Sequence, residues 1–549
     1  MTNKPLATLQ RAQKWLIRKG AENRDAIILG KLQDEIERHL DSLDLKDSVL
    51  FFNASTRLGG MSLNSAFSIL TNLSLHSQGV KTVEWVCKHG MSHCILGTDR
   101  RNPQKPPPCS VCIPQSRRTF RRAEKIWFEF HPDPDLTKQL QELSFDQLSK
   151  VEFHGIPYGT IVLPSLRWIL RQHHIEENKE NLDLFREYIL SAENISREIE
   201  KVLEEIRSQV VVVFNGQFFP EAVVHFVALR KGIRVITHEV ALQPLSAFFT
   251  DGEATAYPVN IPNGFQLNSS QERSLDEYIR HRSQGDFSMA GIRFWPKMHN
   301  LGPEFLKRVE GYKQIVPIFT NVVFDTSQGH ANMLFPDMFA WLDTVRLLIK
   351  KHPETFFVIR AHPDEGRPGK ESQESVAHWV KKNQVDRYPN VLFVDFDEYF
   401  SSYELIEKSK FVMVYNSTIG LEASILGATV LCGGKARYTQ YPTVILPKTA
   451  KEYIEKADEF LKNTKLTFPT EYQQNARKFL YFQLFRTSLS FEAFLNPDPV
   501  RNGYVHFKKF PVKLLDPLHN PLSKILYDGI IKGQPFLMEN TETAIKEHV

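Results

Sequence analysis

Residues 411–423 read Phe-Val-Met-Val-Tyr-Asn-Ser-Thr-Ile-Gly-Leu-Glu-Ala, so that an apolar run passes through small polar residues into a new segment. Five consecutive apolar residues indicate a buried strand, and the residues after the small polar turn indicate a helix. A strand followed directly by a helix is the repeating unit of parallel α/β folds. The stretch therefore predicts an α/β fold, provided that the unit recurs along the chain.

The unit recurs on both sides of this stretch. A helix is expected at 338–351, and apolar strands are expected at 315–321, 356–360, 391–394, 411–415 and 429–432. Strands that alternate with helices over such a length predict a doubly wound, Rossmann-like domain, which we assign to residues 311–475.

The first half of the chain carries a similar series. Strands are expected at 48–53, 81–87, 209–215 and 234–239. Gly59 and Gly60 form a turn between the first strand and a helix. We assign 46–265 to an amino-terminal Rossmann-like domain, preceded by an amphipathic helical lead-in over 1–45. The predicted fold class is thus α/β, with two Rossmann-like domains that face a cleft.

Two further segments lack this pattern. Residues 266–310 are expected to connect the domains, because 255–300 is rich in Pro, Asn, Ser and Gly and has no sustained period. Residues 476–549 are expected to form a helical and irregular extension. Within it, 477–486 places four aromatic residues between cations. We prefer a helix that closes over the first domain, with peripheral membrane contact as the alternative.

The composition sets limits on function. A chain of 549 residues exceeds what one hydrophobic core usually serves, so two domains are expected. Apolar residues make up 42% and charged residues 24%, which excludes extensive disorder. The formal net charge of +4 does not indicate a nucleic-acid partner. Since no stretch approaches the roughly 20 apolar residues of a spanning helix, we expect a cytoplasmic enzyme, at most attached to the inner face of the membrane.

The turn within 415–423 is the strongest candidate site. Backbone N–H groups at a helix start and Ser or Thr hydroxyls suit a phosphate. The alternative, in which Ser417 or Thr418 only caps the helix while Glu422 packs nearby, fits the same residues equally well. The candidate donor-binding residues of this turn are Asn416, Ser417, Thr418, Gly420 and Glu422.

A second strand end, at 358–363, reads Val-Ile-Arg-Ala-His-Pro and brings a cation and an imidazole to the same edge of the sheet. Pro363 ends the strand and fixes the turn after His362. Arg360, His362 and Pro363 are therefore further donor-binding candidates, and His362 can donate to a phosphate oxygen or offset charge on a departing nucleotide. The alternative is a histidine bonded to the backbone, but two such strand ends in one domain favour the ligand role.

Two strands of the first domain also end in polar residues. Ligands of open parallel sheets bind beyond the carboxyl ends of strands, so Asn215, His238 and Glu239 are candidates to face the cleft. Gly59 and Gly60 are candidates to bring the backbone close to a ligand, although tight turns use glycine equally often.

A transfer reaction needs a base that takes the proton of the acceptor hydroxyl, and a carboxylate is the usual solution. We favour Glu239 and Asp325, without ranking them, over Asp251 and Glu253. For each of these carboxylates, a role as a cap or a salt-bridge partner is the alternative.

Four cysteines cluster in the segment 87–112, which we treat as an insertion in the first domain. The last pair has the two-residue spacing of zinc knuckles, whereas the first pair is spaced more widely. A structural Zn²⁺ bound by the four thiols would tie down the proline-rich segment between them, and four reduced thiols are the alternative. The cysteines are Cys87, Cys94, Cys109 and Cys112.

The two strand-end motifs, 360–363 and 416–423, are followed by Gly433, Gly434 and Tyr438. Over roughly residues 315–445, the chain resembles the carboxy-terminal half of the bacterial capsule-polysaccharide biosynthesis glycosyltransferases, and Kdo transferases and bacterial sialyltransferases share a similar His-Pro and Ser/Thr pair. The resemblance implies a GT-B fold and metal-independent transfer with no catalytic cofactor. It also implies a donor nucleotide held mainly by the second domain, with its phosphates at the two motifs and Tyr438 in the cleft.

The sequence thus predicts a glycosyltransferase that moves a sugar from a nucleotide-sugar donor to a surface or capsular glycan, either free or lipid-linked. Inversion by direct displacement is expected, because no pair of carboxylates at glycosidase spacing is evident. One rival is a polyol-phosphate transferase with a CDP-activated donor. Another is a glycan- or nucleotide-binding protein without catalytic activity.

Overall fold

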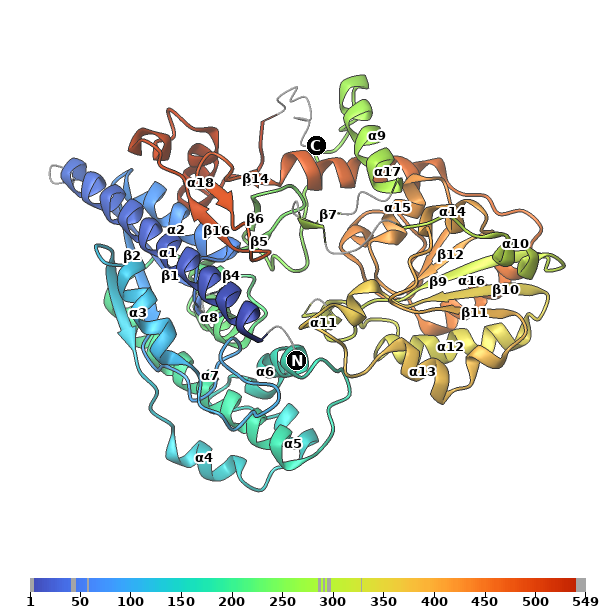
Figure 1. The fold of residues 1–549 in the computed structure, drawn as a ribbon, viewed down its shortest axis with the longest axis horizontal. Coiled ribbons are helices and arrows are strands. Elements are labelled where there is room, and N and C mark those ends of the chain that lie inside the picture. The colour runs from blue at the N-terminus through green and yellow to red at the C-terminus, as the bar shows by residue number, and fades with distance from the viewer. Residues whose placement is uncertain are drawn as a thin grey trace.

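The chain forms two α/β domains, each built on a largely parallel sheet, and Figure 1 shows the first domain on the left and the second on the right. A computed structural model describes residues 4–40, 46–56, 59–284, 288–289, 292–293, 298–326 and 328–539. The predicted fold class is confirmed, since both sheets have helices on their faces and parallel strands at their centres.

The first sheet has seven strands in the order β14-β6-β5-β4-β1-β2-β3. The five strands from β3 to β5 are parallel, and β6 and β14 extend the sheet in antiparallel fashion. Their bounds are β1 (Lys46–Phe52), β2 (Val80–Cys87), β3 (Glu124–Phe128), β4 (Val210–Phe214), β5 (Arg234–Val240), β6 (Ser246–Thr250) and β14 (Leu489–Ser490). All four strands predicted for this domain are present.

The second sheet has five parallel strands in the order β11-β10-β9-β12-β13. Their bounds are β9 (Gln314–Phe319), β10 (Thr355–Arg360), β11 (Val391–Val394), β12 (Val412–Val414) and β13 (Val430–Cys432). In both sheets the chain starts in a central strand, moves outward on one side and then continues on the other. Ligands of such sheets bind where the order reverses, which is between β1 and β4 and between β9 and β12.

Helices cover both sheets. In the first domain they are α1 (Lys4–Leu40), α2 (Leu63–His76), α3 (Cys109–Thr119), α4 (Pro134–Leu140), α5 (Phe145–Ser149), α6 (Tyr158–Leu170), α7 (Lys179–Ile206) and α8 (Phe219–Arg230). The second domain contains α10 (Pro303–Val309), α11 (Gln328–Ala331), α12 (Met338–Lys351), α13 (Val376–Lys382), α14 (Ser402–Glu407), α15 (Ile419–Ile425) and α16 (Ala450–Lys462). The helix predicted at 338–351 coincides with α12.

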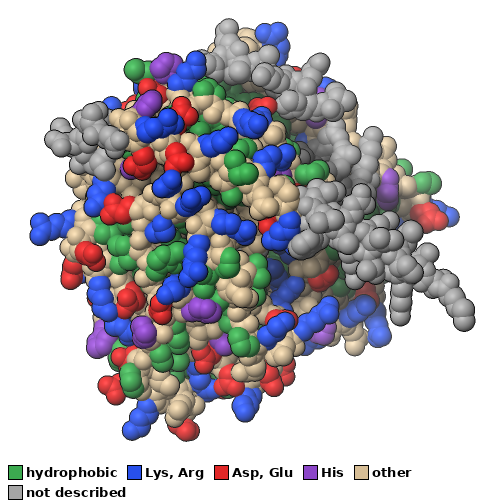
Figure 2. All heavy atoms as spheres, turned by 60° about the vertical axis from the view of Figure 1, so that its left-hand side comes forward, with side chains coloured by type: hydrophobic (Ala, Val, Ile, Leu, Met, Phe, Trp, Pro, Cys, Tyr) green, Lys and Arg blue, Asp and Glu red, His purple; other side chains and the backbone are tan. Residues whose placement is uncertain are grey.

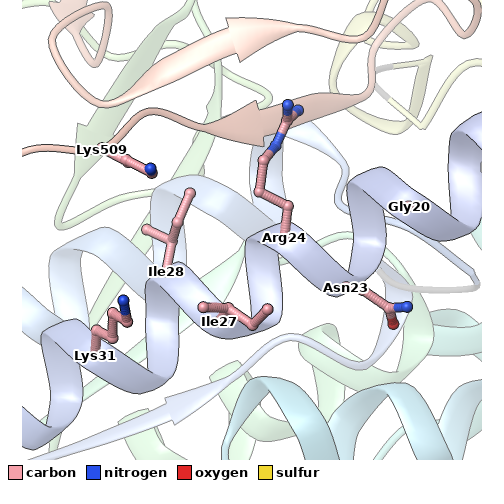
Figure 3. A pocket seen from close by; sticks show the side chains of 7 residues that line it. All are labelled: Gly20, Asn23, Arg24, Ile27, Ile28, Lys31 and Lys509. Atoms are coloured by element: carbon pink, nitrogen blue, oxygen red, sulfur yellow. The ribbon is translucent and has the colours of Figure 1, made fainter.

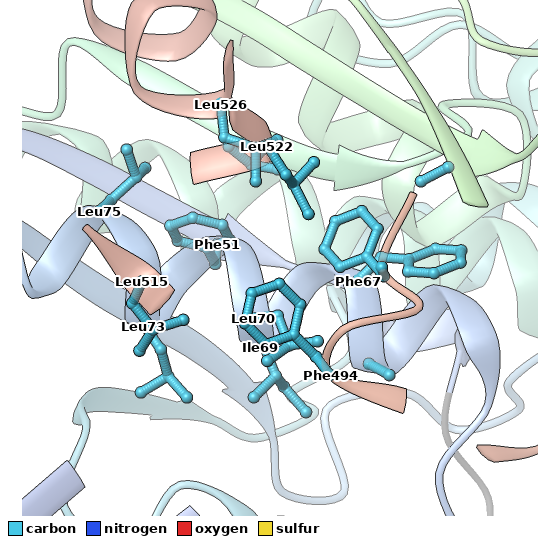
Figure 4. Close-up of a cluster of buried hydrophobic side chains, with 14 of the residues drawn as sticks. Phe51, Phe67, Ile69, Leu70, Leu73, Leu75, Phe494, Leu515, Leu522 and Leu526 are labelled. Carbon is cyan, nitrogen blue, oxygen red and sulfur yellow. The ribbon is translucent and has the colours of Figure 1, made fainter. Parts of the chain in front are cut away.

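The carboxy-terminal segment returns to the first domain. After α17 (Thr470–Tyr481) and a π-helical turn at Phe482–Arg486, β14 pairs with β6 and α18 (Pro521–Lys532) packs on α2. Figure 4 shows Leu522 and Leu526 of α18 beside Phe51 and Phe67 of the first domain. Each such buried side chain contributes about 1.5–3 kcal/mol to the free energy of unfolding.

The aromatic segment 477–486 was expected either to close over the first domain or to contact a membrane. Phe479, Tyr481 and Phe482 are buried against the second domain and the connection between the domains. Side chains that are buried in this way are not available to a membrane surface. The segment was expected to form a helix that closes over the first domain. It packs on the second domain instead, and the chain reaches the first sheet only beyond it, at β14.

The connection contains a helix that the sequence did not predict. α9 (Ser269–Ser283) is 15 residues long and lies within the segment that we assigned to the connection. Asn268 accepts backbone N–H bonds at its start, and Gln271 completes a capping box. Only Leu275 of this helix is buried, so the apolar period that would reveal it in the sequence is missing.

The surface of the first domain is mixed in charge. Figure 2, which brings the first domain forward, shows basic and acidic side chains interspersed over that face. Within the described ranges, no helix has both the length and the apolar character that a bilayer crossing requires.

Candidate functional site

A cavity of about 350 Å³ lies between the two domains, at the carboxyl ends of β9, β10 and β12. Leu242 and Thr255 of the first domain also contribute to its walls. Its volume falls within the roughly 300–1,000 Å³ that is common for ligand sites. Of the residues predicted for the site, those that line the cavity are Asp325, Arg360, His362, Pro363, Asn416, Ser417, Thr418, Glu422 and Tyr438.

The turn after β12 is held in place by its neighbours. The side-chain amide of Asn321 donates to the side-chain oxygen of Asn416 across 2.8 Å. The hydroxyl of Tyr438 donates to the Ser417 carbonyl at 2.7 Å. A Cβ atom at Gly420 would lie 2.4 Å from the Tyr438 hydroxyl, so this position requires glycine. Gly420 and the buried Tyr438 therefore support the turn, and the ligand-facing groups come from the turn itself.

Thr418 is an exposed residue of the cavity wall, whereas Ser417 is buried in that wall. Thr418 occupies the N-cap position of α15, but its side chain makes no capping hydrogen bond. The alternative in which this residue serves only as a side-chain cap is therefore not what the structure contains. The helix is short, at seven residues, so the hydroxyls matter more here than its dipole.

His362 lies at the start of the turn that follows β10. Its Nδ1 accepts the backbone N–H of Asp364 at 3.1 Å, and Pro363 begins a short 3-10 helix. Burial lowers the pKa of the imidazole, and the Arg360 cation acts in the same direction against the Asp364 and Asp325 carboxylates. The ring is therefore neutral at neutral pH. Because Nδ1 is an acceptor, the proton of the neutral ring is on Nε2, which makes Nε2–H a donor.

Arg360 has a structural role beside its place in the cavity wall. Its guanidinium is buried and donates to the Phe400 carbonyl, which fixes the loop before α14. Burial lowers the pKa of Arg360 to about 10, so the group remains charged at neutral pH. The charged Arg360 guanidinium therefore adds positive potential to the cavity from within its wall.

The Glu422 carboxylate also forms hydrogen bonds with other side chains of the protein. One carboxylate oxygen accepts from Arg282 Nε at 2.9 Å, and the other accepts from the Tyr403 hydroxyl. Arg282 belongs to α9, so this half-buried ion pair ties the connecting helix to α15.

Among the carboxylates considered as a base, Asp325 is the one that both lines the cavity and is exposed to it. Asp251 makes two hydrogen bonds with Arg234, at 2.8 and 2.9 Å. Glu253 pairs with His330 at 3.0 Å, which lowers the pKa of Glu253.

Glu239 lies outside the cavity wall. Its carboxylate accepts from the side-chain amides of Asn64 and Asn215 and from its neighbour's backbone N–H. Burial raises its pKa above the usual range. Glu239 pairs with Phe248 in the ladder between β5 and β6, so it belongs to the strand and does not follow its end.

The other candidates of the first domain do not line the cavity either. His238 is buried, its Nε2 is 3.0 Å from Asn53 Oδ1, and burial lowers its pKa to about 3. Gly59 and Gly60 lie under Arg501, which donates to the Gly59 carbonyl at 3.0 Å. A Cβ atom at Gly60 would lie 2.4 Å from the Arg501 guanidinium. The glycines therefore permit an internal contact.

The cavity also contains cations that were not predicted. Lys435 and Arg437 line it immediately after β13, and Arg437 Nε donates to the Thr255 carbonyl of the first domain at 3.1 Å. The strand-end rule that identified the motifs at 358–363 and 415–423 would also have identified these two residues. Arg282 had no such signal, because it comes from a helix about 140 positions away from its partner Glu422.

The four cysteines of the segment 87–112 lie near enough for their thiols to raise one another's pKa. Burial raises the pKa of the Cys94 thiol to about 12, and the thiols of Cys109 and Cys112 act in the same direction. The Cys87 pKa is raised in the same way, and its sulfur accepts the Gly90 N–H at 3.3 Å. None of the four forms a disulfide.

The cysteine sulfur atoms do not form a group of three or more ligand atoms within 4.8 Å of one another, whereas another set of described side chains does. Ligand atoms of His173, His174 and Asp337 lie within 4.8 Å of one another where the two domains meet. His174 is bonded to Glu374 at 2.7 Å and lies 3.3 Å from Asp337, so this group is an ion-pair cluster that links the domains.

A larger groove of about 550 Å³ runs along α1. Figure 3 shows Arg24, Lys31 and Lys509 around two isoleucines of this helix. Its walls contain no carboxylate and no histidine, and no predicted site residue lies there. The cavity between the domains is therefore the candidate site.

Residues 297–442 match the model of the family described as capsule polysaccharide biosynthesis protein. The resemblance predicted from the sequence is thus confirmed for this part of the chain. Protein FixF of Sinorhizobium fredii (strain NBRC 101917 / NGR234) is 26% identical over 238 residues, which cover 42% of this chain. The match covers 49% of that protein, so the chain spans about half the length of its curated relative.

Solved structures show weaker similarity. The Thermosulfurimonas dismutans KpsC beta Kdo 2,4 transferase is 11% identical, covers 56% of this chain and 87% of its own, and has a TM-score of 0.35. The beta Kdo 2,7 transferase of the same protein is 15% identical, with coverages of 59% and 89% and a TM-score of 0.31. UDP-GlcNAc 2-epimerase from Neisseria meningitidis is 12% identical, with coverages of 80% and 99% and a TM-score of 0.25. Similarity at this level says nothing about the activity of this chain.

Proposed function

We propose that the chain is a glycosyltransferase that moves a sugar from a nucleotide-sugar donor to a glycan of the cell surface or capsule. The observation that carries the proposal is the convergence of three groups on the cavity between the domains: His362, the turn at Thr418, and the cations Lys435 and Arg437. An imidazole N–H, hydroxyls and cations are the groups that bind phosphate oxygens. The match of residues 297–442 to capsule polysaccharide biosynthesis proteins supports the pathway.

In the proposed reaction, the acceptor hydroxyl oxygen attacks the anomeric carbon of the donor sugar. The bond between that carbon and the phosphate oxygen breaks, and the configuration inverts. Asp325 takes the proton of the hydroxyl, and the nucleotide leaves with one more negative charge. His362 Nε2–H, the Thr418 hydroxyl and Lys435 stabilise that charge.

A thermal-shift screen with CMP, CDP, UDP and GDP tests the donor half of this proposal. A nucleotide that binds the folded chain raises its Tm, and we expect one of the four to do so by several degrees at millimolar concentration. His362→Ala should reduce the shift, whereas His378→Ala, which removes an exposed histidine of the same domain, should preserve it. The absence of a shift with every nucleotide would contradict the proposal.

Activity assays then separate the rival functions. Incubation with the sugar conjugates of the nucleotide that binds should release free nucleotide and transfer the sugar. Release from CDP-linked polyols and not from nucleotide sugars would favour the polyol-phosphate transferase. Binding without turnover of any conjugate would favour a recognition protein.

A further inference from the structure

Arg171 is a buried cation between the two domains whose charge lacks hydrogen-bond partners. It follows α6, and its side chain is 3% exposed. Its Nε and Nη1 atoms are buried and have no hydrogen-bond partner within the described chain. A guanidinium stays charged at any physiological pH, and a buried charge without partners is costly. A buried polar atom without a partner calls for a specific explanation, and a bound ion is one of the explanations that apply to a buried cation.

The position of Arg171 is fixed by packing. Its guanidinium lies 4.0 Å from the ring centre of Trp168 in the first domain and 4.7 Å from that of Phe324 in the second. Its carbonyl accepts the Gln373 N–H at 2.8 Å. Phe324 directly precedes Asp325, so the orphan nitrogens lie beside the cavity wall that holds the proposed base.

Other cations surround Arg171. Arg100 of the first domain donates to the Gly369 carbonyl at 2.6 Å, and a turn joins Arg367 to Lys370 in the second domain. Burial lowers the pKa of Arg171 to about 10, and the Arg100 and Arg367 cations act in the same direction. Burial lowers the pKa of Lys370 as well, and the Arg367 and Arg171 cations add to this effect.

Carboxylates also act on these cations. Those of Glu371 and Asp325 act to raise the pKa of Arg171, and those of Asp364 and Asp325 act to raise the pKa of Lys370.

The loop that carries two of these cations offers further groups for a ligand. Asp364 Oδ1 and Ser372 Oγ are buried and have no hydrogen-bond partner in the described residues. Asp364 also lines the cavity, and its Oδ1 is 3.8 Å from Arg367. A serine hydroxyl can donate to an anion, and a carboxylate oxygen can accept from a sugar hydroxyl. The junction thus presents both kinds of group that an acidic sugar requires.

We propose that Arg171, with Arg100, Arg367 and Lys370, binds an anionic group of the acceptor, either a carboxylate of an acidic sugar or a phosphate. The site places that acceptor beside Asp325, between the two domains. The assignment of the anion to the acceptor rests on the proposed function, whereas the anion site itself does not.

Calorimetric titration with sodium glucuronate, inorganic phosphate and glucose tests the site. We expect the chain to bind glucuronate or phosphate and to bind glucose at least tenfold more weakly. Arg171→Met should weaken anion binding at least tenfold, and Lys370→Met, which removes a second cation of the site, should weaken it about threefold. Arg101→Met, at an exposed neighbouring cation, should leave it unchanged.

The relative binding of the two anions identifies the class of acceptor. Preference for glucuronate identifies an acidic sugar, and preference for phosphate identifies a phosphorylated acceptor. Equal binding of glucose, binding of neither anion, or unchanged binding in both Arg171→Met and Lys370→Met overturns the proposal. The nucleotide thermal shift should persist in Lys370→Met, so loss of the anion site and failure of the glycosyltransferase assignment remain distinguishable.

Discussion

The side chain of Asn321 donates to that of Asn416 across 2.8 Å, between the ends of β9 and β12. These two strands flank the point at which the strand order of the second sheet reverses. Asn416 directly precedes Ser417 and Thr418, so the bond joins the donor turn to the centre of the sheet. The position of the candidate site thus follows from the topology of the fold.

A double-mutant cycle on this pair should show coupling. Asn321→Ala and Asn416→Ala should each lower the free energy of unfolding by about 1 kcal/mol, because each removes one buried hydrogen bond. The double variant should lose clearly less than the sum of the two, as measured by urea unfolding. Strictly additive losses would show that the two side chains act independently.

Asp325→Asn should lower kcat by about 10²–10⁴-fold, because an amide cannot take the proton of the acceptor hydroxyl. The nucleotide-induced thermal shift should be unchanged. Asp251→Asn is the matched control, since Asp251 is paired with Arg234 outside the cavity, and it should retain turnover. If Glu239→Gln abolished turnover and Asp325→Asn did not, the base would have to be reassigned to Glu239.

The ion-pair cluster between the domains should make stability depend on pH. Hydrogen bonds to Asp337 and then Glu374 raise the pKa of His174 to about 10. A histidine with a raised folded-state pKa contributes stability that is fully present below its ordinary value of about 6.5 and is lost as pH rises through about 10. Since His174 is 60% exposed, we expect no more than about 1 kcal/mol.

His174→Gln should therefore reduce the loss of unfolding free energy between pH 7 and pH 10. Chemical unfolding at several pH values measures this difference. His378→Gln, at an exposed position, should keep the dependence of the wild-type chain. An identical dependence in His174→Gln would show that the cluster does not titrate in this range.

The cysteine cluster keeps its proposed role as a structural zinc site. Metal analysis of the purified chain should find about one equivalent of zinc, and Cys109→Ser should lose it together with several degrees of Tm. Cys432→Ser is the control, because Cys432 lies in β13 of the other domain. A metal-free chain in which all four thiols react with a thiol reagent would contradict the proposal.

The sequence predicts the strands well because each is a continuous apolar run, such as β10 and β12, that ends in polar residues. It does not predict α9, whose exposed surface leaves no apolar period. Glu239 was misplaced because β5 continues to Val240 and pairs with β6, so the residue lies within the ladder. Arg171 could not be identified, since its environment depends on side chains from both domains that are distant in the chain.

The most direct test of the central claim is the turnover of His362→Ala with the nucleotide sugar that binds. If His362 and the turn at Thr418 stabilise the departing nucleotide, kcat should fall by about 10²–10³-fold, and Thr418→Ala should lower it in the same direction. Turnover by His362→Ala at the wild-type rate would contradict the account.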